Sequence, residues 1–121
     1  MVEKEEFYLY SYDAKQAVED GVLIEINPAL SQEAGYRWPV RISQGVSSLA
    51  TPTEQEQQQG QSFSGRLWDI LWMARITLSN ANPGDYIVPF EVILGKRITR
   101  LWACLDTTSG PAIHIITPEE Y

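Results

Sequence analysis

The feature that most limits what this chain can fold into is the pattern of residues 64–79. Six residues recur there at spacings of three and four, namely Leu67, Trp68, Leu71, Trp72, Arg75 and Ile76. Such spacing places side chains on one face of a helix. Ser62 or Ser64 can cap its first turn, and residues 80–84 end the pattern with turn-forming types. We therefore expect one long helix that must bury its stripe against another element.

Three strand-like runs follow this helix, over residues 86–94, 98–105 and 112–116. Gly95-Lys96 separates the first two and is short enough for a tight hairpin. The runs predict a C-terminal three-stranded antiparallel meander. The fold class is then α+β, with a mostly antiparallel sheet packed on one central amphipathic helix.

The N-terminal half predicts shorter elements. The expected strands are residues 7–12, 22–26 and 36–42, and the expected helices are residues 13–20, 28–34 and a single turn over 43–50. Pro39 cannot donate to a sheet ladder, so we expect residues 36–42 to form an edge strand.

The glutamine-rich segment 51–62 has no apolar periodicity. It is predicted to be a mobile surface loop that adds nothing to the core. With 121 residues, the chain has the length of one domain, and we assign residues 1–121 to a single unit.

Composition limits the cellular location and the kinds of partner that this chain can have. The formal net charge is −7, which argues against a protein that binds nucleic acid by neutralising phosphates. No stretch is apolar enough to span a membrane, and the acidic start of the chain predicts no signal peptide. The single cysteine, Cys104, cannot form an internal disulfide, so we expect a cytoplasmic protein.

Few residues carry the signature of known chemistry. His114 is the one histidine and lies between two isoleucines, which predicts a half-exposed strand histidine rather than a general base or a zinc ligand. Cys104 is expected to act as a small buried hydrophobe. The chain has no phosphate-binding glycine motif, so we predict no metal, no nucleotide and no other cofactor.

Residues 65–75 form the constellation that stands out. Trp68 and Trp72 share a helix face, whereas Arg66 and Asp69 lie on a neighbouring strip where they can pair. One interpretation is structural, with the tryptophans filling the core and the Arg-Asp pair fixing the start of the helix. The other is functional, with an exposed Trp-Arg surface of the composition found in interface hot spots. The candidate binding residues are Arg66, Trp68, Asp69, Trp72 and Arg75.

Three strings carry a resemblance to a family. They are D-G-V-L from Asp20, W-P-V from Trp38 and G-R-L-W-D-x-L-W-M from Gly65. Together they resemble an uncharacterised family of small bacterial and phage proteins. The resemblance implies a shared fold and no known chemistry. Occurrence in phage genomes favours a regulatory or inhibitory role, by analogy alone.

The leading functional hypothesis is a small non-enzymatic protein that acts by interaction or regulation, with another protein as its partner. The alternative is a small-molecule-binding protein or hydrolase with a pocket beside the Trp/Arg helix, lined by Arg66, Asp69 and Arg75. A third reading, an acidic mimic of nucleic acid, fits less well because the N-terminal acids are mixed with strand residues. The sequence leaves the oligomeric state open, a homo-oligomer included.

Overall fold

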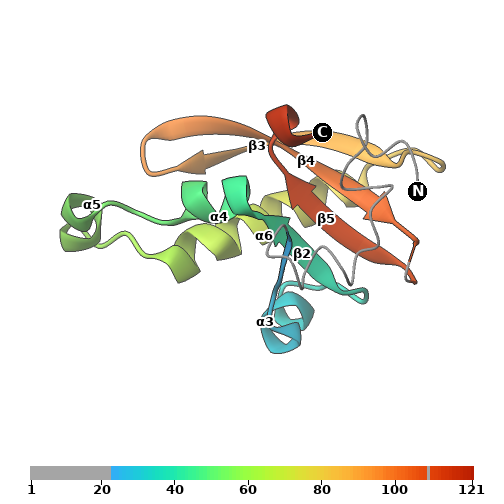
Figure 1. The fold of residues 1–121 in the computed structure, drawn as a ribbon, viewed down its shortest axis with the longest axis horizontal. Coiled ribbons are helices and arrows are strands. Elements are labelled where there is room, and N and C mark those ends of the chain that lie inside the picture. The colour runs from blue at the N-terminus through green and yellow to red at the C-terminus, as the bar shows by residue number, and fades with distance from the viewer. Residues whose placement is uncertain (1–22, 109) are drawn as a thin grey trace.

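The computed structural model describes residues 23–108 and 110–121 of the chain. The strand and helix predicted over residues 7–12 and 13–20 lie outside the described residues. The described part holds a five-stranded sheet in the order β1-β2-β5-β4-β3, together with helices α3 to α6 (Figure 1). The predicted α+β class and the mostly antiparallel sheet are confirmed.

The strands are β1 (Leu23–Glu25), β2 (Val40–Ser43), β3 (Ile87–Leu94), β4 (Arg97–Asp106) and β5 (Ala112–Ile116). β4 pairs with both β3 and β5 in antiparallel fashion, and β1 pairs with β2 in the same way. β2 and β5 form a parallel pair with Arg41 opposite His114.

The connection between β3 and β4 is a two-residue turn. Gly95 has a φ of +66°, which is what the first central position of a type II′ hairpin requires.

β2 is not the edge strand that Pro39 predicts. It lies between β1 and β5, because Pro39 precedes the strand rather than interrupting it. The missing N–H is thus outside the ladder, while the Pro39 carbonyl still accepts a 2.9 Å hydrogen bond from the Ile113 amide.

The helices are α3 (Pro28–Glu33), α4 (Gln44–Ala50), α5 (Glu54–Gln58) and α6 (Phe63–Ser79), and a short 3-10 turn covers Pro118–Glu120. α6 begins after Ser62, whose hydroxyl accepts from the Gly65 amide at 3.0 Å, and it lies against the sheet (Figure 1). α4 likewise begins after a serine, with the Ser43 hydroxyl accepting from the Val46 amide. The turn expected over residues 43–50 is therefore a complete short helix.

One core lies between α6 and the sheet. Leu67, Ile70, Leu71 and Ala74 bury the inner stripe of α6 against sheet residues such as Ile42, Val92, Leu101 and Ile115. Tyr36 is part of this core, and its hydroxyl donates a 2.7 Å hydrogen bond to the Leu71 carbonyl. Burial raises the pKa of this phenol above its usual range.

The segment 51–62 differs from the predicted loop in two ways. α5 interrupts it, because Thr53 and Glu56 form a reciprocal capping box around the first turn. Pro52 is buried, although no residue of α5 is. Among the described helices, none is long and apolar enough to cross a membrane.

Candidate functional site

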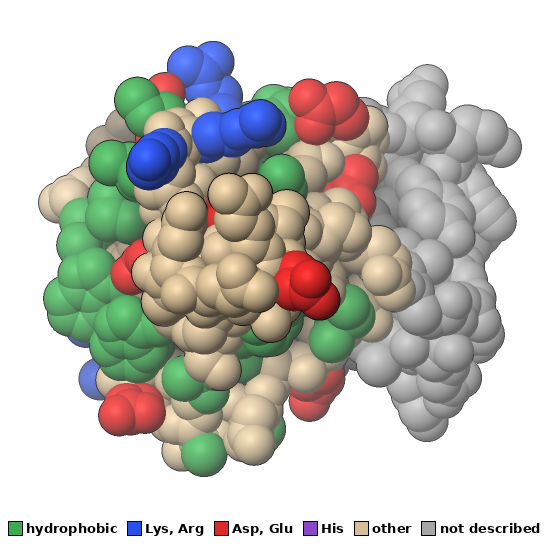
Figure 2. Space-filling model, turned by 90° about the vertical axis from the view of Figure 1, so that its left-hand side faces the viewer, with side chains coloured by type: hydrophobic (Ala, Val, Ile, Leu, Met, Phe, Trp, Pro, Cys, Tyr) green, Lys and Arg blue, Asp and Glu red, His purple; other side chains and the backbone are tan. Residues whose placement is uncertain are grey.

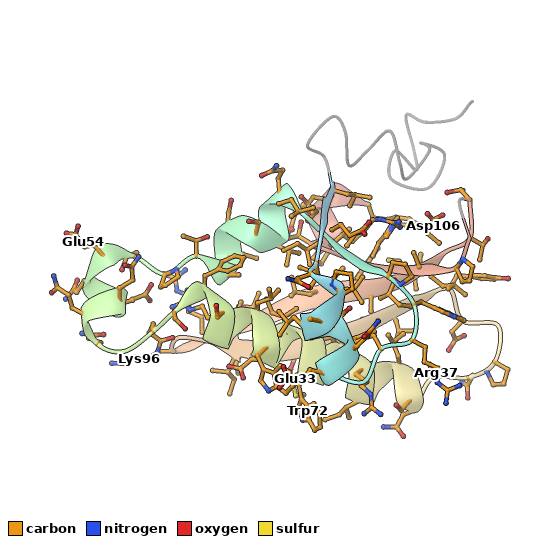
Figure 3. All side chains as sticks on the ribbon, turned by 90° about the horizontal axis from the view of Figure 1, so that it is seen from below. Glu33, Arg37, Glu54, Trp72, Lys96 and Asp106 are labelled. Carbon is orange, nitrogen blue, oxygen red and sulfur yellow. The ribbon has the colours of Figure 1, made fainter. Side chains whose placement is uncertain are left out.

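The two tryptophans of α6 stack on each other but differ in exposure. Their ring centroids are 6.1 Å apart with an interplanar angle of 16°. Trp68 is half-buried and packs against the core, whereas Trp72 is 43% exposed. Figure 3 shows Trp72 on the outer side of α6, away from Asp106 on the other side of the molecule. The structural interpretation therefore describes Trp68, which packs against the core, and the functional interpretation describes Trp72, which is exposed.

A groove of about 430 Å³ separates α6 from the outer edge of β3. Its lining residues are Asp69, Trp72 and Met73 of α6, Glu91, Val92 and Ile93 of β3, and Ile98 of β4. Val92 is buried toward α6, whereas Glu91 and Ile93 are exposed on the opposite face of the strand. The groove therefore follows the open edge of β3.

The apolar side chains around this groove are unusually open to solvent. Ile93 is 63% and Ile98 71% exposed, and the two face each other across the β3–β4 hairpin. Ile76 follows Trp72 by one helical turn and is also exposed. Figure 2 shows hydrophobic side chains gathered along one side of the molecule, with Lys and Arg side chains above them. A continuous apolar surface of this kind is typical of interaction sites.

The polar part of the groove consists of two carboxylates. Asp69 is exposed on α6, and Glu91 pairs with Arg100 at 3.0 Å on the neighbouring strand. Among the residues that the structure describes, no serine, threonine, cysteine, lysine or histidine lines the groove. Among the described lining residues, Asp69 and Glu91 are thus the only ionisable side chains.

Arg66 does not reach this groove, and it does not pair with Asp69 as the spacing suggested. Its side chain is only 8% exposed and turns toward α5, where Nη2 lies 3.1 Å from a Glu56 carboxylate oxygen. Nη1 donates to the Leu49 carbonyl and Nε to the Gln61 side chain, both at 3.3 Å. Arg66 is a structural residue that ties α4, α5 and α6 together.

The buried guanidinium gives α5 a role in stability. Glu56→Gln keeps an acceptor for the capping box but removes the charge beside Arg66, so the melting temperature should fall by roughly 3 to 6 °C. Glu54→Gln is the matched control, since it removes the same charge from the same helical turn without touching the ion pair. Differential scanning calorimetry compares them, and equal midpoints would show that the ion pair adds nothing.

Arg75 lies on the far side of Trp72 from the groove. Its guanidinium carbon is 6.0 Å from the Trp72 ring centroid, and Nε donates a 3.4 Å hydrogen bond to the Gly35 carbonyl. Gly35 has a φ of +100°, and a Cβ there would collide with the Arg75 side chain. Arg75 also borders a separate hollow next to Arg37 and Trp38. Of the five candidate residues, only Asp69 and Trp72 therefore meet in the groove.

A row of polar side chains crosses the sheet on the face turned away from α6. The Glu25 carboxylate accepts from Arg41 Nε at 3.1 Å, and Arg41 Nη1 donates to His114 Nε2 at 3.3 Å. His114 Nε2 is also 3.6 Å from an Asp106 carboxylate oxygen. The row follows from strand register, because Glu25, Arg41 and His114 are successive cross-strand partners. Sequence reasoning missed it, since the four residues come from four separate strands.

His114 is fully buried, not half-exposed as predicted from its strand position. Burial lowers the pKa of the imidazole to about 4; the nearby Asp106 acts in the opposite direction and Arg41 in the same one. The ring is therefore neutral at pH 7 and can accept the Arg41 hydrogen bond. Cys104 is buried beside it on β4, opposite His114. Within residues 23–108 and 110–121, no three His, Cys, Asp or Glu side chains are placed to share a metal ion.

Comparison of the chain with models of known families, with curated proteins and with solved structures finds no significant match. The family resemblance carried by the three sequence strings therefore stays a prediction.

Proposed function

We propose that this protein works without catalysis of its own, by associating with another protein molecule through the surface of α6 and β3. The observation that carries the proposal is the exposure of Trp72, Ile93 and Ile98 around one groove. Large apolar side chains cost free energy when they face water, and burying Trp72 alone on binding would remove substantial apolar area from solvent. Trp is among the residue types that dominate interface hot spots.

The setting of this surface fits such a role. α6 is anchored in the core by Ile70, Leu71 and Ala74, so Trp72 sits on a fixed helix, and Ile93 and Ile98 sit on paired strands. A rigid surface loses little conformational entropy on binding. A cytoplasmic location, with a regulatory or inhibitory action on the partner, completes the proposal; the lone buried Cys104 is compatible with a reducing compartment.

Site-specific photo-crosslinking tests this proposal. A photoreactive benzoyl-phenylalanine replaces Trp72 in the full chain, which is expressed in cells that carry its gene. We expect a discrete adduct from position 72, containing either a different protein or a second copy of this chain. The same amino acid at the exposed residue Gln58 of α5 should give no such adduct. Identical adduct patterns from the two positions, or none from either, would contradict the proposal.

A second candidate is a small-molecule-binding protein, favoured by the size of the groove. Its volume of about 430 Å³ lies within the range of ligand pockets, which is roughly 300 to 1,000 Å³. Aromatic and aliphatic walls with two carboxylates would suit a cationic amphiphilic molecule. Quenching of Trp72 fluorescence by such a ligand would support it, measured in a variant in which the other three tryptophans, Trp38, Trp68 and Trp102, are replaced by Phe.

A further inference from the structure

The hydrogen-bonding groups on the open edge of β3 can be assigned from its pairing with β4. The Tyr86 carbonyl accepts a 2.9 Å hydrogen bond from the Leu105 amide, so the backbone groups of Tyr86 face β4. In an antiparallel pair this direction alternates along the strand. The N–H and C=O groups of Val88, Phe90, Val92 and Leu94 therefore face β4. Those of Ile87, Pro89, Glu91 and Ile93 face outward, where no described strand pairs with them.

Pro89 removes one donor from this edge. Because it occupies an outward-facing position, its missing N–H costs β3 no hydrogen bond to β4. The edge keeps a complete set of donors and acceptors at Glu91 and Ile93. A strand that added to β3 would therefore gain most by pairing with residues 91–93.

We propose that β3 pairs edge to edge with β3 of a second copy of this chain, antiparallel and with the two-fold axis beside Val92. This inference rests on the proposed function and names the partner at the groove. With the axis beside Val92, Glu91 of one protomer lies opposite Ile93 of the other. Four main-chain hydrogen bonds then form, two for each pair of facing residues. An axis beside Glu91 would also allow four bonds, but it would place the two Glu91 carboxylates directly opposite each other, which is unfavourable.

The side chains agree with this register. Glu91 is held by Arg100 of its own protomer at 3.0 Å, so the axis brings no uncompensated carboxylates together. The two Ile93 side chains, each 63% exposed, would lie diagonally across the axis on one face of the joined sheet, with Ile98 beside each of them on β4. On the other face the groove beside Trp72 and Met73 would be continued by its copy. The surface is thus self-complementary, as an isologous interface requires.

Sedimentation equilibrium of the full chain between about 2 and 200 µM tests the dimer, because strand pairing over a small area is expected to give a dissociation constant in the micromolar range. We expect the mass to rise from 13.7 kDa toward twice that value. Glu91→Pro removes an outward N–H and leaves pairing with β4 intact, and it should weaken association by at least about thirtyfold. Glu91→Ala keeps the N–H and should weaken it by less than about threefold.

Amide hydrogen exchange of the unmodified protein gives a readout that does not depend on a variant that folds. The Glu91 and Ile93 amides should be protected at high protein concentration and exchange rapidly at low concentration, whereas the Val92 amide, bonded to β4, should be protected at both. A 13.7 kDa species at every concentration overturns the dimer, and so does a dimer that Glu91→Pro weakens no more than Glu91→Ala. A monomer that still crosslinks to a different protein from position 72 would overturn this inference and leave the proposed function standing.

Discussion

Trp68→Ala is expected to lower the free energy of unfolding by about 2 to 4 kcal/mol, and Trp72→Ala by less than about 1 kcal/mol. Trp68 packs against the core cluster, so its truncation removes apolar contacts and leaves a cavity at the border of the core. Trp72 is 43% exposed and contributes the stacking contact with Trp68 and a cation–π contact with Arg75. Urea denaturation of the two variants against the parent measures the difference.

The same pair of variants separates stability from binding. Trp72→Ala should leave the protein folded but weaken its binding to the partner found by crosslinking by about 2 kcal/mol or more. This is how a surface hot spot behaves. Arg75→Ala serves as a neighbour control, since it removes the side chain over Trp72 but borders a different hollow. If Trp72→Ala destabilises the protein as much as Trp68→Ala, Trp72 is a core residue and the groove loses its central contact.

Acidification should destabilise the protein through His114. Burial holds the pKa of the folded imidazole at about 4, whereas the unfolded side chain titrates near 6.5. Between these values the unfolded chain binds a proton that the folded chain does not, so stability falls as the pH falls from about 6.5 to about 4. The loss over this window is about 2 to 3 kcal/mol. Above pH 7 both states are neutral at this site and the effect is absent.

Denaturation midpoints at a series of pH values, for the parent and for His114→Gln, measure this contribution. Gln can still accept the Arg41 hydrogen bond but does not titrate, so the variant should lose clearly less stability than the parent over the same window. Parallel pH profiles would show that His114 is protonated equally easily in the folded and unfolded states.

The sequence predicted best the elements whose signal is local. The spacing of Leu67, Leu71 and Trp72 located α6, and runs of β-branched residues located β3 and β5. Capping chemistry also placed α3, where the Asn27 side chain accepts from the Ala29 amide. These features depend on neighbours within about four residues along the chain, which a single sequence displays.

The features that the sequence did not predict depend on partners distant in the chain. Arg66 pairs with Glu56 rather than with Asp69, because the packing of α4 and α5 buries its guanidinium. The position of β2 inside the sheet depends on its parallel pairing with β5, about 70 residues later. The same pairing buries His114, whose strand position alone predicted half exposure. The groove likewise needs α6 and β3 side by side before Asp69 and Glu91 belong to one site.

The polar row across the sheet also decides how β2 and β5 align. Main-chain hydrogen bonds in a parallel pair are nearly the same at any offset that is a multiple of two residues, since such an offset keeps every side chain on its own face. A two-residue shift would place Arg41 beside Ala112 or Ile116 and break its hydrogen bond to His114. A buried polar group that loses its hydrogen-bond partner is costly. The row therefore favours the observed alignment of β2 and β5 over the shifted alignments that backbone hydrogen bonding alone would allow.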